Sequence, residues 1–89
     1  MCMKDLLEIL EKIAELLYQE RYNEAYGILI KCLPIMGAYI GEVQDEDLQR
    51  GIMGALEEAV SAMENNDYTL LADILQYDVI EKLKDSGVE

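Results

Sequence analysis

Carboxylates are the most numerous side chains in this sequence that can act as acids, bases or metal ligands. Five of them lie in two groups, Glu8, Glu11 and Glu15 in one and Glu57 and Glu58 in the other. Carboxylate metal sites inside helical bundles pair a glutamate with a histidine three residues later, but the sequence contains no histidine. The hydrophobic periodicity also places these glutamates on the outer faces of helices. We therefore expect a solvated acidic surface there and no bound metal.

The Asp-Glu-Asp run at 45–47 does not match a calcium-binding loop either. Counted from its first aspartate, the sixth position is Arg50 instead of glycine and the twelfth is Leu56 instead of glutamate. The two serines, Ser61 and Ser86, have no base near them in the sequence. The glycines lie inside helical patterns, whereas a phosphate-binding loop follows a strand. We therefore expect no catalytic residue and no cofactor, and we predict that the chain is not an enzyme.

The remaining reactive side chains, two cysteines and six tyrosines, indicate packing more than chemistry. Cys2 and Cys32 are far apart and form no Cys-x-x-Cys motif, which argues against a disulfide framework and a zinc ribbon. Cys32 is expected in the core, whereas the exposure of Cys2 stays open. Without cationic residues beside them, the tyrosines lack the main source of affinity for nucleic acid. We expect Tyr22 and Tyr68 to pack at two hairpin turns with their rings inward.

The net charge limits the kinds of partner that we expect this protein to bind. Nineteen Asp and Glu residues against seven Lys and Arg residues give a net charge of −12 over 89 residues. Such a surface repels phosphate backbones and anionic lipid, so nucleic acid and membrane surfaces are poor partners. A basic peptide or a positive patch on another protein is compatible with it, although a charged, solvated surface is the commoner reason for such a balance.

Length and composition predict one folded domain over residues 1–89. A second domain would leave each half too short to bury a stable core, and 52 % apolar residues are enough to fill one core. Charge appears at Lys4 and recurs every few residues, so the sequence shows no secretory signal. We therefore expect a cytoplasmic protein.

Helical periodicity predicts the elements that position these side chains. Four segments show it, at 3–17, 23–43, 45–64 and 69–84. Asp45 and Asp67, or their neighbours, are suited to cap the third and fourth helices. No segment shows the alternation of a half-buried strand. We predict an all-α fold, a four-helix bundle built from two helical hairpins. Aligning the hairpins places Tyr22 on Tyr68, which leaves an internal duplication open.

The second segment is apolar on every side of its helix axis, which predicts a position at the centre of the bundle. Residues 26–41 carry one charge in sixteen positions, and this stretch is shorter than the roughly 20 residues that cross a bilayer. Pro34 lacks the N–H that would bond the carbonyl of Ile30. The helix therefore either kinks at Pro34 and continues, or ends there and is followed by a short helix from Pro34 to about Val43.

Two interpretations of the apolar stretch are open. In the first it is core, and Gly37 and Gly41, together with Gly51 and Gly54, let the second and third helices approach closely. In the second, one side of the stretch stays uncovered in the monomer and forms a groove or a dimer face that binds a partner. The residues of this predicted partner-binding strip are Ile35, Met36, Tyr39, Ile40 and Val43.

Two parts of the sequence resemble known kinds of protein. The tract AMENNDYTLLADILQYDVIEKLK at 62–84, in which a polar-Asp-Tyr turn precedes LADxLxYx, resembles small all-helical bacterial domains without an assigned function. This resemblance implies a helical fold and a bacterial cytosolic setting, with no catalytic residues. The order of elements, with NEAYGILIKCLPIM in the second helix, is similar in pattern to the helical-bundle chaperones that hold flagellar export substrates. That similarity implies a groove for an amphipathic client segment.

These observations favour a non-enzymatic protein-protein interaction module or adaptor, which recognises a partner protein through an apolar strip rimmed by acid. An export-chaperone-like protein that holds an amphipathic client segment is one alternative. A structural homodimer is another.

Overall fold

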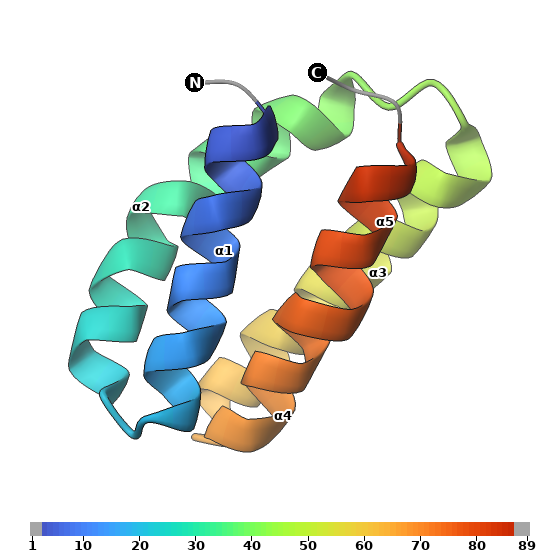
Figure 1. The fold of residues 1–89 in the computed structure, drawn as a ribbon. Helices are drawn as coiled ribbons and strands as arrows, with labels where there is room; N and C mark the ends of the chain where they lie inside the picture. Colours follow the sequence, from blue (N-terminus) through green and yellow to red (C-terminus); the bar gives the residue numbers. More distant parts are fainter. Residues whose placement is uncertain (1–2, 87–89) are drawn as a thin grey trace.

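The computed structural model describes residues 3–86, and its regular structure is entirely helical there (Figure 1). Three helices precede a fourth helical run, which we call the fourth helix. The elements are α1 (Met3–Tyr18), α2 (Tyr22–Gly41), α3 (Glu46–Glu64) and, in the fourth helix, α4 (Tyr68–Asp73), the π-helical η1 (Ile74–Val79) and α5 (Ile80–Asp85). The predicted all-α bundle of two helical hairpins is therefore confirmed, with no strand in the described part of the chain. Cys2, whose exposure was open, lies outside the described residues.

Both hairpins turn with the same backbone geometry. One residue with positive φ follows the first helix of each hairpin, Glu20 (63°) in one and Asn66 (56°) in the other. In both turns the next N–H donates to the carbonyl five residues earlier at 2.9 Å, which is a Schellman-type helix end. Tyr22 and Tyr68 then begin α2 and α4, and their rings stack with centroids 3.7 Å apart. The prediction that these tyrosines pack at the hairpin turns is confirmed.

The inner helices of the bundle are α1 and the fourth helix, which pack against each other. α1 also packs against α2, while α3 packs mainly against the fourth helix (Figure 1). The prediction that the second helix is central and buried on every side is therefore wrong. Only one face of α2 is buried in the core, through Leu29, Cys32 and Met36 among others. Ile30, on another face of the same helix, is 59 % exposed. Apolar composition alone did not reveal which faces a neighbouring helix would cover.

Pro34 lies inside α2 and does not end it. The helix runs unbroken from Tyr22 to Gly41 and bends over its second half toward the α2–α3 connection (Figure 1). Of the two alternatives at Pro34, the kinked and continuing helix is the one observed, because a proline removes one hydrogen bond while the neighbouring turns keep theirs. Within residues 3–86 no helix is both long enough and apolar enough to span a membrane.

Aspartates cap the two helices for which the sequence suggested them. The side chain of Asp45 accepts hydrogen bonds from the backbone N–H groups of Asp47 (3.0 Å) and Leu48 (3.1 Å) at the start of α3. Asp67 accepts from the N–H of Leu70 at 3.2 Å at the start of α4. Each bond satisfies an N–H that has no partner within its own helix, which explains why the helices begin there.

A π-helical turn interrupts the fourth helix, for which the sequence predicted one regular segment at 69–84. A π turn inserts an extra residue and so rotates the residues that follow around the helix axis. Val79 at the end of this turn, and Ile80 and Leu83 after it, are at most 2 % exposed, whereas Asp78 within the turn and Lys82 after it are partly exposed and form an ion pair of 3.5 Å. The irregular turn thus keeps the apolar face aligned along the whole helix.

Candidate functional site

The predicted partner-binding strip lies mostly in the core. Met36 is fully buried, Tyr39, Ile40 and Val43 are at most 8 % exposed, and Ile35 is partly buried. The expectation that one side of these five residues stays uncovered in the monomer is therefore wrong for four of them, because they lie on the face of the chain that closes the core. Of the five, Ile40 also lines an open cavity.

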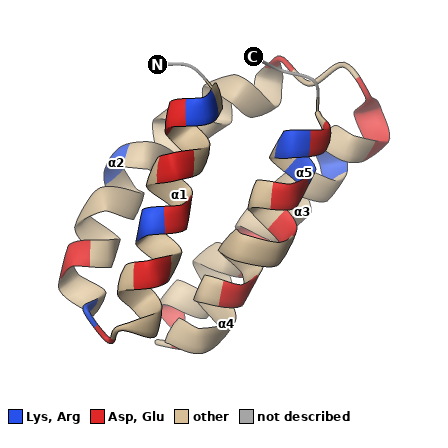
Figure 2. Ribbon diagram, in the orientation of Figure 1, with Lys and Arg blue, Asp and Glu red and all other residues tan. Residues whose placement is uncertain are grey.

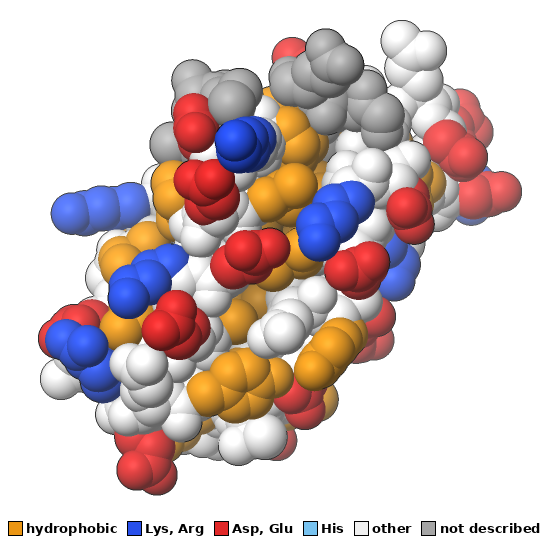
Figure 3. Space-filling view, viewed as in Figure 1, with side chains coloured by type: hydrophobic (Ala, Val, Ile, Leu, Met, Phe, Trp, Pro, Cys, Tyr) orange, Lys and Arg blue, Asp and Glu red, His pale blue; other side chains and the backbone are white. Residues whose placement is uncertain are grey.

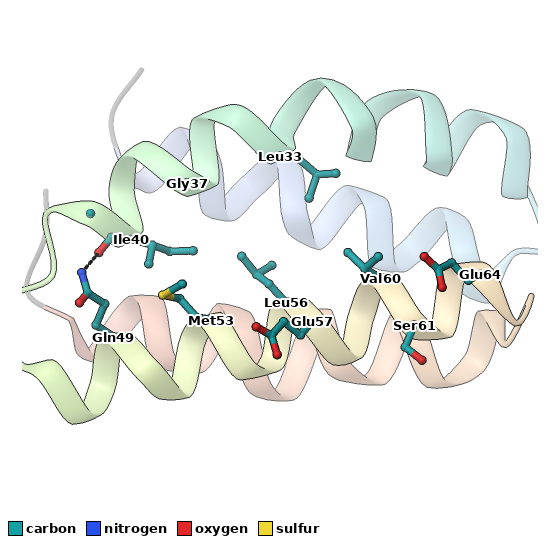
Figure 4. A pocket seen from close by; sticks show the side chains of 11 residues that line it. Leu33, Gly37, Ile40, Gln49, Met53, Leu56, Glu57, Val60, Ser61 and Glu64 are labelled. Atoms are coloured by element: carbon teal, nitrogen blue, oxygen red, sulfur yellow. Dashed lines mark hydrogen bonds between the residues drawn. The ribbon is translucent and has the colours of Figure 1, made fainter.

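That cavity is a groove between α2 and α3, with a volume of about 720 Å³ (Figure 4). Apolar side chains from both helices point into it, and polar side chains of α3 lie along its outer edge. The lining residues are Leu33, Gly37, Ile40 and Gly41 of α2 and Gln49, Met53, Leu56, Glu57, Val60, Ser61 and Glu64 of α3. The α2–α3 groove is therefore an open and mainly apolar feature of the surface.

The wall formed by α3 has an unusual distribution of side-chain sizes. Three alanines, at positions 55, 59 and 62, are at most 6 % exposed on the face that packs into the bundle. On the groove face, Met53 is 50 % exposed and Val60 is 40 % exposed. Helices ordinarily turn their largest apolar side chains toward the core, because burial there removes the most apolar surface from water. α3 therefore carries two apolar faces. The covered face holds the three alanines and the fully buried Ile52, and the groove face is left open.

The wall formed by α2 has open space where side chains are missing. A Cβ atom placed on Gly37 or Gly41 would meet no atom within 4 Å. The same holds for Gly54 of α3, whereas a Cβ on Gly51 would lie 3.3 Å from the Cε of Lys82, in the fourth helix. The prediction that the glycines let α2 and α3 approach closely is therefore wrong. Gly37 and Gly41 instead widen the groove by one empty side-chain position on each of two successive turns.

Contacts between the walls mark the two ends of the groove. At one end the side-chain amide of Gln49 donates to the backbone carbonyl of Ile40 at 2.8 Å (Figure 4). At the other end the Tyr26 hydroxyl donates a long bond of 3.5 Å to the carbonyl of Met63. From Gln49 to Met63 the wall of α3 rises by about 21 Å at 1.5 Å per residue. The uncovered apolar surface is thus a trough of about four helical turns, bridged at each end.

Charge is distributed unevenly around the groove. Glu57 and Glu64 stand on its α3 edge, both exposed, and the ion pairs found among residues 3–86 involve neither of them. On α2, the only charged residue between Glu24 and Glu42 is Lys31, so much of that helix is uncharged (Figure 2). The face formed by α1 and the fourth helix differs, since acidic, basic and apolar side chains are interspersed on it (Figure 3).

The pKa shifts found within residues 3–86 are those of tyrosines and of one buried cysteine. Burial raises the pKa of the Cys32 thiol, which keeps it protonated at neutral pH and unreactive. Burial also raises the pKa of Tyr26, beside the end of the groove. Among the described residues, no three His, Cys, Asp or Glu side chains are arranged to hold a metal ion. The α2–α3 groove thus offers shape, apolar surface and negative charge, which are the properties of a binding surface.

The sequence indicated this site only in part. It drew attention to the apolar second helix and to Gly37 and Gly41. The strip that it predicted lies mostly on a different face of that helix from the open groove. Met53 and Val60, which are half-exposed in the groove, are sequence neighbours of the buried Ile52 and Ala59. No local signal separates them, because both faces of α3 carry apolar residues at helical spacing.

Comparison with known proteins gives one match. The sequence profile of a domain of unknown function, DUF8042, matches residues 3–87, which is nearly the whole chain. Searches of curated proteins and of solved structures return no significant match. The similarity to export chaperones therefore stays a prediction, while the predicted membership of a small domain family without an assigned function is confirmed. The chain belongs to the DUF8042 family.

Proposed function

We propose that this protein is a non-enzymatic protein-interaction module whose α2–α3 groove holds an apolar segment of a partner protein. The observation that carries the proposal is that α3 buries Ala55 and Ala59 and leaves the larger apolar side chains of Met53 and Val60 at the open surface. Neither side chain is needed to close the core. A partner that covers them would remove from water the surface that folding leaves exposed.

A protein is the partner class that best fits this surface. The net charge of −12 opposes binding to phosphate backbones and to anionic lipid head groups. The groove itself is mainly apolar, and a trough of this kind fits the apolar face of a polypeptide segment. Completing the burial of a half-exposed Met or Val would stabilise a complex by about 1 kcal/mol for each side chain.

The test uses a double substitution in the groove, Met53→Asp with Val60→Asp. Both side chains are half-exposed, so the variant should fold with unchanged helicity by circular dichroism. Leu70→Asp is the matched control, because Leu70 is 47 % exposed but lies in the fourth helix outside the groove. Proteins captured from an extract of the native cell by wild type and by the two variants would be identified, and each candidate would be purified and titrated against all three.

A partner that binds wild type and Leu70→Asp with equal affinity, and binds the groove variant at least tenfold more weakly, supports the proposal. A purified partner whose affinity is unchanged by Met53→Asp with Val60→Asp would contradict it. Light scattering on the same samples covers the homodimer alternative. If wild type is a dimer and the variant with Met53→Asp and Val60→Asp is a monomer, a second copy of the chain covers the groove.

A further inference from the structure

We infer that the occupant of the α2–α3 groove is a single amphipathic α-helix of a partner protein, which carries basic residues along the edge that faces α3. This inference rests on the proposed function and adds the conformation and the charge of the bound segment. It follows from three properties of the groove, namely its helical walls, its glycine positions and its unpaired acidic edge.

The walls favour a helical occupant over an extended one. An extended peptide needs a partner for its backbone N–H and C=O groups, which an exposed strand edge supplies. Both walls of this groove are helices, whose backbone groups bond within the helix except at the helix ends and in the turn before Pro34. A helix satisfies its backbone internally and can present one purely apolar face. The length of the trough, about 21 Å, corresponds to about 14 residues of α-helix. A helix of about four turns would therefore fill it.

The glycines of α2 provide positions for large side chains of that helix. Gly37 and Gly41 are one turn apart, and a Cβ atom on either would meet no neighbour within 4 Å. Side chains at i and i+4 of a docked helix also lie one turn apart on one face. Two bulky apolar residues at this spacing can thus occupy the empty positions, as knobs enter holes between packed helices.

The acidic edge selects the charge of the occupant. Glu57 and Glu64 are seven residues apart and so lie on the same side of α3, two turns from each other. Because neither forms an ion pair within residues 3–86, a lysine or arginine on the docked helix can pair with each. Two basic residues that are also seven apart on one edge of the occupant would match them.

The same charges disfavour a second copy of this chain as the occupant. Docking two grooves together would bring the α3 edges, with Glu57 and Glu64 on each, into one interface. Each copy carries a net charge of −12, and like charges that face each other across an interface weaken association. The observations therefore favour a partner of opposite charge.

The probes are three synthetic amphipathic peptides of four helical turns with an identical leucine face. They differ only at two positions seven apart on one edge, which are both lysine, both glutamine or both glutamate. Affinities are measured by fluorescence anisotropy with wild-type protein at low ionic strength and again in 0.5 M salt. We expect the lysine peptide to bind about tenfold more tightly than the glutamate peptide, and the difference to shrink in salt.

Two pairs of variants locate the binding site. Glu57→Gln with Glu64→Gln should remove the preference for lysine while retaining binding of the glutamine peptide, whereas Glu58→Gln, an exposed α3 residue that does not line the groove, should keep the preference. Gly37→Leu should weaken all three peptides at least tenfold. Gly27→Leu is its control, because a Cβ there also meets nothing within 4 Å but Gly27 does not line the groove.

Each outcome separates this inference from the proposed function. Equal affinities for the three peptides, all lost with Gly37→Leu, would overturn the charge selection and leave the groove as the binding site. Peptides that bind Gly37→Leu and Gly27→Leu equally well would show that they do not dock in the groove, which overturns the inference. If no peptide binds while Met53→Asp with Val60→Asp still abolishes capture of a purified partner, the occupant is not such a helix. A groove-dependent dimer in light scattering would identify a second copy as the occupant and would also overturn it.

Discussion

The closed and open sides of this bundle both carry apolar side chains on facing helices, but only on the closed side are these side chains covered. On the closed side, α1 and the fourth helix meet through side chains such as Leu10, Leu71 and Leu75, all of them fully buried. On the open side, α2 and α3 carry Leu33, Leu56 and Met53 on facing surfaces, yet a groove separates them. The difference shows that apolar side chains alone do not close a helix–helix interface.

The way in which the two hairpins dock accounts for this difference. Each hairpin pairs one inner helix with one outer helix, α1 with α2 and the fourth helix with α3. The inner helices bring the hairpins together, so the outer helices remain at the periphery. Since Gly37 and Gly41 lack side chains on the facing surface of α2, little on that helix reaches across to α3.

The largest expected effect is the difference in stability between a core substitution on the closed side and a groove substitution on the open side. Leu10→Ala should lower the free energy of unfolding by about 3 kcal/mol, because it leaves a cavity beside a fully buried position. Met53→Ala, at a side chain that is 50 % exposed, should lower it by less than about 1 kcal/mol. Urea denaturation of both variants measures the difference. Equal losses would mean that the open side is packed as tightly as the closed one.

A smaller effect of opposite sign is expected at the glycines. Gly37→Ala should raise the free energy of unfolding by about 0.5 to 1 kcal/mol, because alanine favours the helix and its Cβ meets nothing within 4 Å. Gly51→Ala should gain less, since its Cβ would lie 3.3 Å from the side chain of Lys82. The same urea titrations compare the two. A destabilised Gly37→Ala variant would indicate that α2 and α3 pack more closely than the groove allows.

The smallest effect concerns a hydrogen bond that spans the closed side. The Tyr18 hydroxyl donates to Asp73 at 2.5 Å, from α1 to α4, and this bond raises the pKa of Tyr18 to about 12 from its ordinary 10.0. Tyr18→Phe should lower the free energy of unfolding by about 0.5 kcal/mol at neutral pH. Tyr26→Phe on the open side should cost less, because its bond to the carbonyl of Met63 is long, at 3.5 Å.

The contribution of Tyr18 should also depend on pH. The folded state holds the hydroxyl proton to a higher pH than the unfolded state does, so the contribution is complete below pH 10 and disappears as the pH rises through about 12. The difference in stability between wild type and Tyr18→Phe should therefore shrink between these values. Chemical denaturation at several pH values measures it, and a difference that stays constant up to pH 12 would contradict the assignment.

Local features of the fold were predictable because their causes are local. The predicted helix at 3–17 is one residue shorter than α1, and the predicted helix at 69–84 is one residue shorter than the fourth helix at each end. Asp45 and Asp67 were identified as caps from residue type and position alone. In each case the interactions involved span a few residues, so the sequence around the element contains the whole physical argument.

The candidate site was predictable only as a region. The apolar second helix suggested a binding surface on one of its sides, but of the residues predicted for that surface Ile40 lines the groove, whereas Met36, Tyr39 and Val43 are buried in the core. Met36 and Tyr39 belong to the same helix as Gly37 and Gly41 and differ from them only by a fraction of a turn around its axis. A helix that is apolar on all sides contains no internal signal for the side that its neighbours will cover.

The sequence by itself determined the helices, their turns and caps, the net charge of −12 and the excess of apolar side chains. Only the tertiary structure decided that α1 and the fourth helix are the inner helices, that α3 buries Ile52 and its alanines but not Met53, and that a groove stays open between α2 and α3. The physical reason is that backbone hydrogen bonds and helix ends depend on residues near in sequence. The choice of which apolar face to bury depends on how two hairpins dock, and docking is a sum over contacts between residues far apart in the chain.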